Sequence, residues 1–432
     1  MRVIRSSAPV LNDPVLEQYL TELGNRLVAH AHDVKTPFYF FLLRNDEINA
    51  FAFFGGHVGV HTGLFLNADN ESQLASVLSH EITHVTQRHL ARSAEAQAKT
   101  GPAAIAGLLG AILLTIAAPQ AGMAAIATTQ ALATQTRINY TRLHEKEADR
   151  IGMQVLVDAG FDPYASGDFF AKLANRYRYT SKPPQMLLTH PLPESRISEA
   201  RIRAQQYPHR HIPDDLSYQL AKARIQVRYS SLSAGAALQL FEDQLKNRSY
   251  TFKDAALYGK ALSLMRSEDN KQAEQIIDQL LKKDPHNLFY LDTQSDLLLG
   301  RDDYKKAIAV LSKERDLKPT SEVININLAN AYIEAKQANK AIPILEEALF
   351  LNKQSPVPYL LMADAYKQLG NRSMQYFVSA ENYALAANYN KAIDQLNYAY
   401  QYAQNDPLQR ARIEARISQF KQAEKQLDTL KN

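Results

Sequence analysis

Near its start the chain has apolar residues at helical spacing, over residues 14–31. Two aromatic-rich segments follow, at 38–42 and 50–54, and they have the composition of strands. A Gly-Gly turn at 55–56 leads into an alternating segment at 57–61 that reads as a returning strand. These patterns predict one helix followed by a small antiparallel sheet, and a helical pattern then covers residues 70–98.

From about residue 213 the chain reads as consecutive amphipathic helices with an internal repeat. The residues that recur at a spacing of 34 are Ala273, Ala307 and Ala341, and also Pro285 and Pro319. This period, with small residues at fixed positions, is typical of tetratricopeptide repeats, where alanine allows paired helices to approach closely. Lys353 stands where the next proline is expected. Solenoid packing without exact repeats therefore stays an alternative.

Between Lys99 and Arg137 lie 37 residues without a charged side chain. Residues 102–118 approach the ~20 apolar residues that a membrane-spanning helix needs. The second part of the segment contains several Thr and Gln residues and is too polar to span well. Three interpretations stay open: helices packed within the protein, a mobile or membrane-surface segment at 100–136, and a true membrane span.

Composition narrows the class of protein. Hydrophobic residues make up 46% of the chain and charged residues 22%, as in ordinary globular domains. The net charge of +4 is too small to argue for nucleic-acid binding. There is no cysteine, which excludes disulfides, thiol catalysis and cysteine-ligated metals. The N-terminus lacks the apolar run of a secretory signal, so we expect a cytosolic chain or a mature form without its signal.

Eleven of the twelve histidines lie between His30 and His211, so the chemistry is expected in the first half. We predict a domain of residues 1–212 that carries this chemistry and a helical-repeat domain of residues 213–432. The fold class is α+β and mostly α: a first domain with a small antiparallel sheet, followed by an all-α solenoid.

The sharpest motif is His-Glu-Ile-Thr-His at residues 80–84. On a helix, His80 and His84 lie one turn apart on the same face and could hold one Zn²⁺. Glu81 sits beside that site and is placed to deprotonate a water molecule. Short patterns of this kind also arise by chance, so a solvated helix with incidental histidines is the alternative.

A catalytic zinc needs a third protein ligand, and without cysteine this must be His, Asp or Glu. Glu145 is the candidate, because Glu145 and Asp149 share one face of a predicted helix. Glu145 could bind the metal, and Asp149 could accept a hydrogen bond from a ligand imidazole. Taken alone, these residues favour a charged surface helix, and the metal reading depends on accepting the histidine motif.

With Glu-x-x-Ala-Asp at residues 145–149, the histidine motif resembles that of the M48 metallopeptidases, which are gluzincins. Residues 49–53, the two glycines after them and residues 61–64 also resemble this family's segment ahead of the zinc helix. With the repeats attached, the chain resembles envelope proteases of this family. The resemblance implies a gluzincin-type domain with zinc ligands His80, His84 and Glu145.

The same resemblance implies roles for other residues. Glu81 would be the catalytic base and Asp149 an orienting residue. His190, before Pro191, would occupy the open position of zinc as a fourth ligand and keep the protease latent; the alternative is that it only ends a loop. Arg196 is a candidate for contacts with substrate or transition state. The remaining candidates, His57, His61, His89 and His144, are expected to be surface or core histidines, with His89 facing away from His80.

The resemblance implies a zinc endopeptidase in the periplasm that degrades misassembled outer-membrane β-barrel proteins and assists their assembly. Its partners would be these substrates and their assembly machinery, bound through the repeats, with peripheral membrane contact through residues 100–136. The alternative function is a binding module or assembly chaperone whose metal site is mainly latent.

Overall fold

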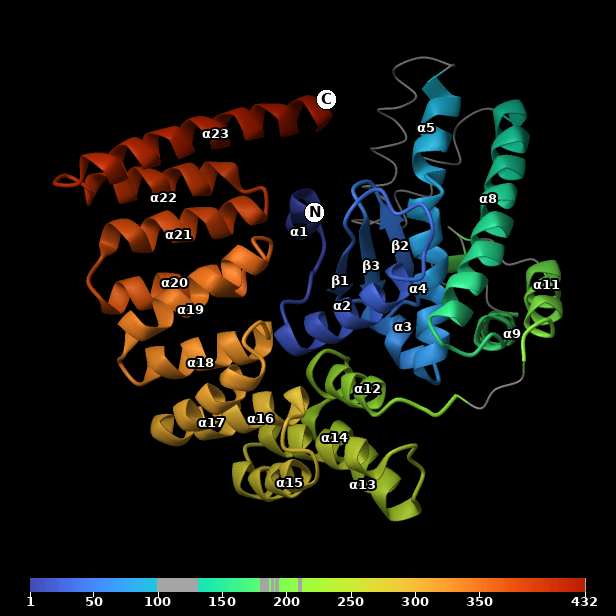
Figure 1. Ribbon diagram of the computed structural model, residues 1–432, viewed down its shortest axis with the longest axis horizontal. Coiled ribbons are helices and arrows are strands. Elements are labelled where there is room, and N and C mark those ends of the chain that lie inside the picture. The colour runs from blue at the N-terminus through green and yellow to red at the C-terminus, as the bar shows by residue number, and fades with distance from the viewer. Residues whose placement is uncertain (99–130, 179–185, 188–189, 191–193, 209–211, 432) are drawn as a thin grey trace. The chain divides into compact units, whose positions relative to one another are not determined.

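The computed structural model describes residues 1–98, 131–178, 186–187, 190, 194–208 and 212–431 (Figure 1). The chain divides into two compact units. The front unit comprises Pro9–Leu11 and Tyr19–Ser263, and the repeat unit comprises Met1–Ala8, Asn12–Gln18 and Leu264–Asn432. The front unit thus extends beyond residue 212, and the predicted boundary between residues 1–212 and 213–432 stays a prediction about independently folding domains.

The front unit contains a mixed three-stranded sheet in the order β1-β3-β2, built from β1 (Tyr39–Leu43), β2 (Ala50–Phe53) and β3 (His57–His61). Strands β2 and β3 pair antiparallel through the expected turn, where Gly55 and Gly56 have φ angles of +82° and +76°. Strand β1 pairs with β3 in parallel. The expectation of a wholly antiparallel sheet is therefore wrong, because side-chain alternation is the same for both strand directions.

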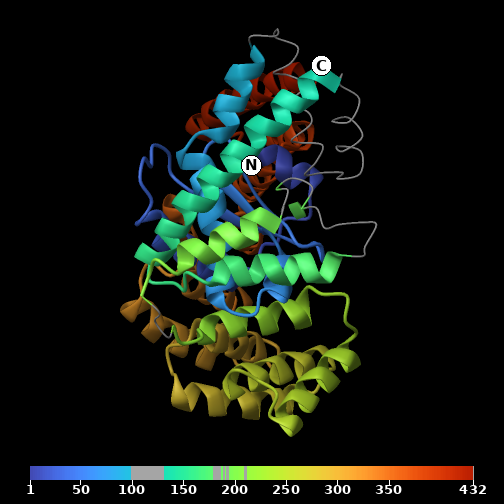
Figure 2. The same ribbon diagram turned by 90° about the vertical axis from the view of Figure 1, so that its right-hand side faces the viewer.

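Most of the front unit is helical. Its helices, some of which also enter the repeat unit, are α2 (Pro14–Val28), α3 (Thr62–Asn67), α4 (Glu71–Thr86), α5 (His89–Ala98), α8 (Ala131–Asp158), α9 (Ala165–Tyr177), α11 (Glu194–Ala204), α12 (Leu216–Arg228), α13 (Ala234–Asn247) and α14 (Lys253–Arg266). Helix α4 packs against β2 and β3 and also against α8 and α9, so most of its residues are buried (Figures 1 and 2).

The helical pattern over residues 70–98 forms two helices rather than one. The side chain of Asn70 caps the start of α4 by accepting a hydrogen bond from the backbone of Gln73. Helix α4 ends at Thr86, and Arg88 has a left-handed backbone with φ of +56°. Helix α5 then starts at His89. This break decides where the His89 side chain points.

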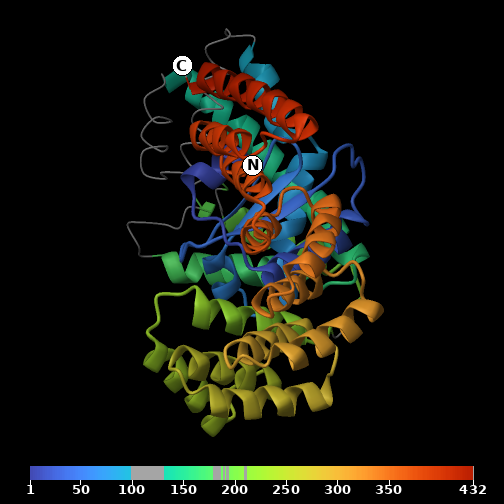
Figure 3. The same cartoon turned by 90° about the vertical axis from the view of Figure 1, so that its left-hand side faces the viewer.

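The repeat unit is built from paired helices that Figure 3 follows in chain order from yellow to red. Its main helices are α15 (Asn270–Lys283), α16 (Leu288–Leu299), α17 (Tyr304–Leu317), α18 (Glu322–Glu334), α19 (Ala338–Leu351), α20 (Val357–Gln368), α21 (Arg372–Leu385), α22 (Tyr389–Gln401) and α23 (Pro407–Lys431). The three alanines that recur with the period of 34 are fully buried between these helices. This burial supports the reason given for their spacing.

The period of 34 also appears in the backbone of the loops between paired helices. Glu268, Asp302, Lys336 and Gly370 are spaced by this period, and their φ angles are +65°, +62°, +61° and +72°. Each repeat therefore makes its turn with one left-handed residue, and only the last uses glycine, which adopts this conformation without steric cost. The regular turn indicates true repeats rather than irregular solenoid packing.

The first residues of the chain also belong to the repeat unit. Helix α1 (Arg2–Ser7) contacts α21, and Arg2 donates a hydrogen bond to the hydroxyl of Tyr389. Close by, Glu17 lies near Glu322 and Asp13, and burial together with these two carboxylates raises the pKa of Glu17 to about 8. Glu17 therefore holds a proton in the native state that the unfolded chain releases near pH 4.5.

Glu17→Gln is expected to stabilise the protein more at pH 8 than at pH 5. The native pKa is raised, so the stability that this carboxyl contributes below pH 4.5 is lost as pH rises toward 8. A neutral amide avoids that loss, and we expect a gain of ~1–2 kcal/mol at pH 8. Thermal unfolding of both proteins at the two pH values measures it, with the exposed Glu334→Gln as control. An equal shift at both pH values would contradict the argument.

Residues 100–130 of the uncharged segment lie outside the described residues, and 131–136 form the start of α8. Within the described part of the chain, no helix has both the length and the apolar character needed to cross a bilayer. The three interpretations of residues 100–136 stay predictions.

Candidate metal centre

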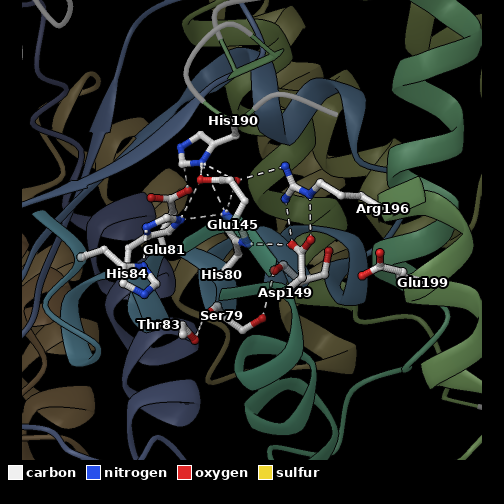
Figure 4. Close-up of polar contacts among 12 residues, drawn as sticks. Ser79, His80, Glu81, Thr83, His84, Glu145, Asp149, His190, Arg196 and Glu199 are labelled. Carbon is white, nitrogen blue, oxygen red and sulfur yellow. Dashed lines mark hydrogen bonds and ion pairs between the residues drawn. The ribbon is translucent and has the colours of Figure 1, made fainter. Parts of the chain in front are cut away.

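One group of side chains in the described part of the chain could hold a metal ion: His80, His84, Glu145 and His190. One ligand atom from each lies within 4.8 Å of those of the others. Helix α4 supplies both motif histidines, α8 supplies Glu145, and His190 comes from the segment before α11. Figure 4 shows these imidazoles and the carboxylate pointing toward one another. The sequence-predicted ligands thus converge.

The facing atoms of the two motif histidines are their Nε2 nitrogens, which are 3.0 Å apart. The Glu145 carboxylate lies across both: Oε2 is 3.3 Å from His80 Nε2, and Oε1 is 3.4 Å from His84 Nε2. These distances show that the ligand atoms of the three residues point at a common centre. His80 and Glu145 are 6% and 4% exposed, while His84 and His190 are partly buried.

A glycine in α8 lets Glu145 reach the motif helix. A Cβ at Gly152 would lie 3.2 Å from the Cα and backbone nitrogen of His80, tighter than ordinary packing allows. Glycine therefore suits the close packing of α8 against α4 at the level of His80, where a Cβ would require its neighbours to shift by a few tenths of an ångström. Gly152 was not singled out from the sequence, because a glycine inside a helical pattern carries no sign of its packing partner.

Asp149 contacts His80, one of the proposed metal ligands, and its predicted orienting role stays a prediction. Its Oδ1 lies 3.0 Å from His80 Nδ1, which leaves Nε2 directed at Glu145. Burial alone would lower the pKa of His80, but the hydrogen bonds with Asp149 and Glu145 raise it to about 10. Without a metal the site therefore draws a proton onto this imidazole.

Arg196 pairs with two of the carboxylates. Its Nε lies 2.7 Å from Asp149 Oδ2, its Nη2 2.8 Å from Asp149 Oδ1, and its Nη1 3.0 Å from Glu145 Oε2. The side chain is 4% exposed, and its guanidinium carbon lies 5.0 Å from the centre of the Phe170 ring. This geometry gives Arg196 a positioning contact with Glu145 and Asp149, and its predicted contact with substrate stays a prediction.

His190 lies on the open side of the group. Its Nδ1 is 3.1 Å from each Glu145 oxygen and 3.4 Å from His80 Nε2, and its Nε2 is 3.5 Å from Glu81 Oε1. Burial works against a charged imidazole, yet Glu145 and Glu81 raise the pKa of His190 overall. The residue is therefore placed both to bind a cation and to bridge the two carboxylates.

Glu81 has the environment expected of a base that is kept from water. It is 1% exposed, and burial raises its pKa above the ordinary value. Its Oε1 accepts no hydrogen bond from the described residues, while the backbone of Ala52 in β2 hydrogen-bonds the carboxylate. A small pocket beside His80 is lined, together with His190 and Arg196, by Ser76, Val77, Phe170, Leu173, Met186 and Leu187.

The charges of the group fit a divalent cation. Glu81, Glu145 and Asp149 would carry three negative charges when ionised, against one positive charge on Arg196, a net of two negative charges in a buried site. Buried charge without compensation is costly, and two imidazoles with a carboxylate are typical ligands of Zn²⁺. The residues present therefore suit a zinc ion by both charge and donor type.

His89 is a residue whose place the sequence did not reveal. It was expected to face away from the motif, as it would on one continuous helix. Because α4 ends at Thr86, its Nδ1 instead lies 3.0 Å from Nδ1 of His84. The expectation was wrong for that reason, and nothing in the local pattern at residues 87–88 announces the break. His57, His61 and His144 are not among the four candidate ligands.

Comparison with known proteins agrees with this geometry. Residues 14–204 match peptidase family M48, and residues 298–363 match the tetratricopeptide repeat. The putative beta-barrel assembly-enhancing protease of Vibrio cholerae is 49% identical over 97% of this chain and 87% of its own length. The beta-barrel assembly-enhancing protease of Escherichia coli is 46% identical over 98% of this chain and 86% of its length.

A more distant relative matches about a third of the chain. The mitochondrial metalloendopeptidase OMA1 of Bos taurus is 33% identical over 34% of this chain and 28% of its own length. The similarity over nearly the whole chain to the two bacterial proteases confirms the resemblance on which the sequence interpretation rested.

Proposed function

The chain belongs to peptidase family M48, and from this premise we propose that it is a zinc-dependent endopeptidase acting in the assembly and quality control of outer-membrane β-barrel proteins. The observation that carries the proposal is the convergence of His80, His84 and Glu145 beside a buried Glu81. Misassembled β-barrel proteins would be its substrates, and the names of the two bacterial relatives support this class.

His80, His84 and Glu145 would hold the zinc, with Asp149 fixing the His80 imidazole and Arg196 fixing both carboxylates. When bound, zinc supplies a Lewis acid that polarises a peptide carbonyl and lowers the pKa of water toward ~7.

Glu81 would move the proton during cleavage. Its carboxylate would accept a proton from the attacking water and pass it to the amine that leaves. Burial raises its pKa, so in the closed site Glu81 is a stronger base than an exposed glutamate. The backbone contact at Ala52 would keep the carboxylate beside the reacting bond.

His190 would restrain this activity. Its Nδ1 lies among the other three proposed ligands, where it could fill the position that a substrate carbonyl or water must take. A fourth protein ligand makes a zinc site closed, like the structural sites of other proteins. Cleavage would then require the segment of His190 to move away.

His190→Ala is expected to increase zinc-dependent cleavage of an unfolded β-barrel protein by about tenfold, because an open ligand position lowers the barrier by ~1.4 kcal/mol. Cleavage is measured by loss of the full-length substrate, with and without a zinc chelator. The parent chain is expected to cleave slowly, and the chelator is expected to stop cleavage by both proteins.

His57→Ala serves as the control, because His57 is a histidine outside the ligand group. It should cleave at the parent rate. If His190→Ala leaves the rate unchanged, the restraint is disproved while the endopeptidase remains. If neither protein cleaves with zinc present, the endopeptidase proposal itself fails.

A second function, assistance of β-barrel assembly without cleavage, is favoured by the names of the bacterial relatives and by the repeats. Repeat solenoids present extended surfaces that bind other proteins, so the repeats would recruit the assembly machinery or its substrates. Both functions place the chain in the periplasm, and residues 100–136 would supply a peripheral contact with the membrane.

A further inference from the structure

The Nδ1 atoms of the two motif histidines have different hydrogen-bond partners. His80 meets a carboxylate directly, since its Nδ1 lies 3.0 Å from Asp149. His84 meets another imidazole, since its Nδ1 lies 3.0 Å from Nδ1 of His89. Beyond it, His89 Nε2 lies 3.0 Å from Glu147 Oε2, which in turn lies 2.9 Å from Arg92 Nη1. A line of hydrogen bonds therefore runs from His84 to the surface.

We propose that His89 is a positioning residue that accepts the Nδ1 proton of His84 and thereby holds its Nε2 toward the metal. This inference rests on the proposed zinc site and adds a residue to it. His89 touches none of the reacting atoms and acts through His84 alone.

The carboxylate of Glu147, at the surface end of this line, fixes the direction of each hydrogen bond. Glu147 can only accept while it is ionised, so His89 donates from Nε2 and its Nδ1 is a free acceptor. His84 then donates from Nδ1, and its Nε2 is left with the lone pair that a metal requires. That nitrogen is the one that faces His80 and Glu145. The carboxylate on α8 thus selects the tautomer of a ligand on α4.

Packing fixes the plane of the His89 ring. The ring is 3% exposed and stacks on His144, with ring centres 4.2 Å apart and planes inclined by 8°. His84 meets it edge-on, at 4.8 Å and 80°. A buried ring held between two others cannot turn freely, so its Nδ1 stays directed at His84. A histidine that merely filled the core would need no such alignment of nitrogen to nitrogen.

The test is the zinc affinity of the full chain, measured by competition with a chromophoric chelator. His89→Leu should weaken zinc binding by about 10–100-fold, the usual cost of losing an outer partner of a metal ligand. His89→Asn should restore most of the affinity, because its side-chain oxygen can accept the His84 proton near the place of Nδ1. Cobalt substituted for zinc should show an altered visible spectrum in the leucine variant and a nearly parental one in the asparagine variant.

His61→Leu is the matched control. His61 is also 3% exposed, and it is not one of the four proposed ligands. It should bind zinc as the parent does, even though a buried imidazole is lost. Folding of each variant is checked by circular dichroism. If the leucine variant does not fold, the zinc affinity of the asparagine variant provides the test.

Parental zinc affinity and cobalt spectrum in His89→Leu would overturn the inference. Equal losses in His89→Leu and His61→Leu, or no recovery in His89→Asn, would show a role in packing only and would overturn it as well. If the parent chain binds no zinc, the proposed function fails first. These results separate the failure of the inference from the failure of the proposal beneath it.

Discussion

Glu81→Gln is expected to leave zinc bound and to lower the rate of cleavage by about 10²–10⁴-fold, the usual share of a positioned base. Glutamine has nearly the same shape but cannot accept and return a proton. The three proposed ligands are separate from Glu81, and the ion pair that its carboxylate makes within the described residues is with His190. The measurement is the rate of substrate loss together with the zinc content of the purified variant.

The control is Glu199→Gln, which removes a carboxylate that pairs with Lys146 on the outside of α8. It should cleave like the parent. Full cleavage by Glu81→Gln, with contaminating protease excluded, would refute the role of Glu81. The same variant separates the two functions: if it still supports β-barrel assembly in cells that lack the parent gene, assistance of assembly does not require cleavage.

Glu145→Gln is expected to weaken zinc binding by at least about 100-fold, beyond the loss typical of an outer partner of a ligand. It removes the negative charge that faces both motif histidines and that Arg196 and His190 also contact. An amide oxygen is a weaker donor to zinc than a carboxylate. Cleavage should fall with the metal, and excess zinc should recover part of it.

Glu145→Gln should also lower the stability of the metal-free protein near neutral pH. Burial alone would raise the pKa of Glu145, but His190 and His80 hold it well below the ordinary value. The depressed pKa means that Glu145 contributes stability above its ordinary pKa of 4.5, which is lost as the pH falls through the native pKa. Chelator competition and thermal unfolding near neutral pH measure the two effects. Unchanged zinc affinity would remove Glu145 from the ligand set.

Much of the chemistry was readable from short stretches of sequence. Two histidines four residues apart face the same way on any helix, so the motif at 80–84 fixed their common direction without knowledge of the fold. The spacing of Glu145 and Asp149 worked in the same manner on α8. The 34-residue period of small residues likewise predicted the repeats, since each helix pair buries its alanines against its neighbour.

The directions of the strands and the contact between His84 and His89 could not be predicted from the sequence. Alternation gave the strands but not that β1 runs parallel to β3. The helical pattern through residues 70–98 concealed the break that carries His89 back to His84. In both cases the local pattern is compatible with more than one path of the chain, and long-range packing selects between them.

Sequence alone determined which side chains are chemically able to bind a metal and move a proton, and it determined the repeating helices, because both depend on periodicities within one turn or one repeat. Only the tertiary structure decided that Glu145 and His190 reach the motif helix and that His89 contacts His84. Those contacts depend on the close crossing of two helices at Gly152 and on a left-handed residue at Arg88, which are properties of packing between distant segments.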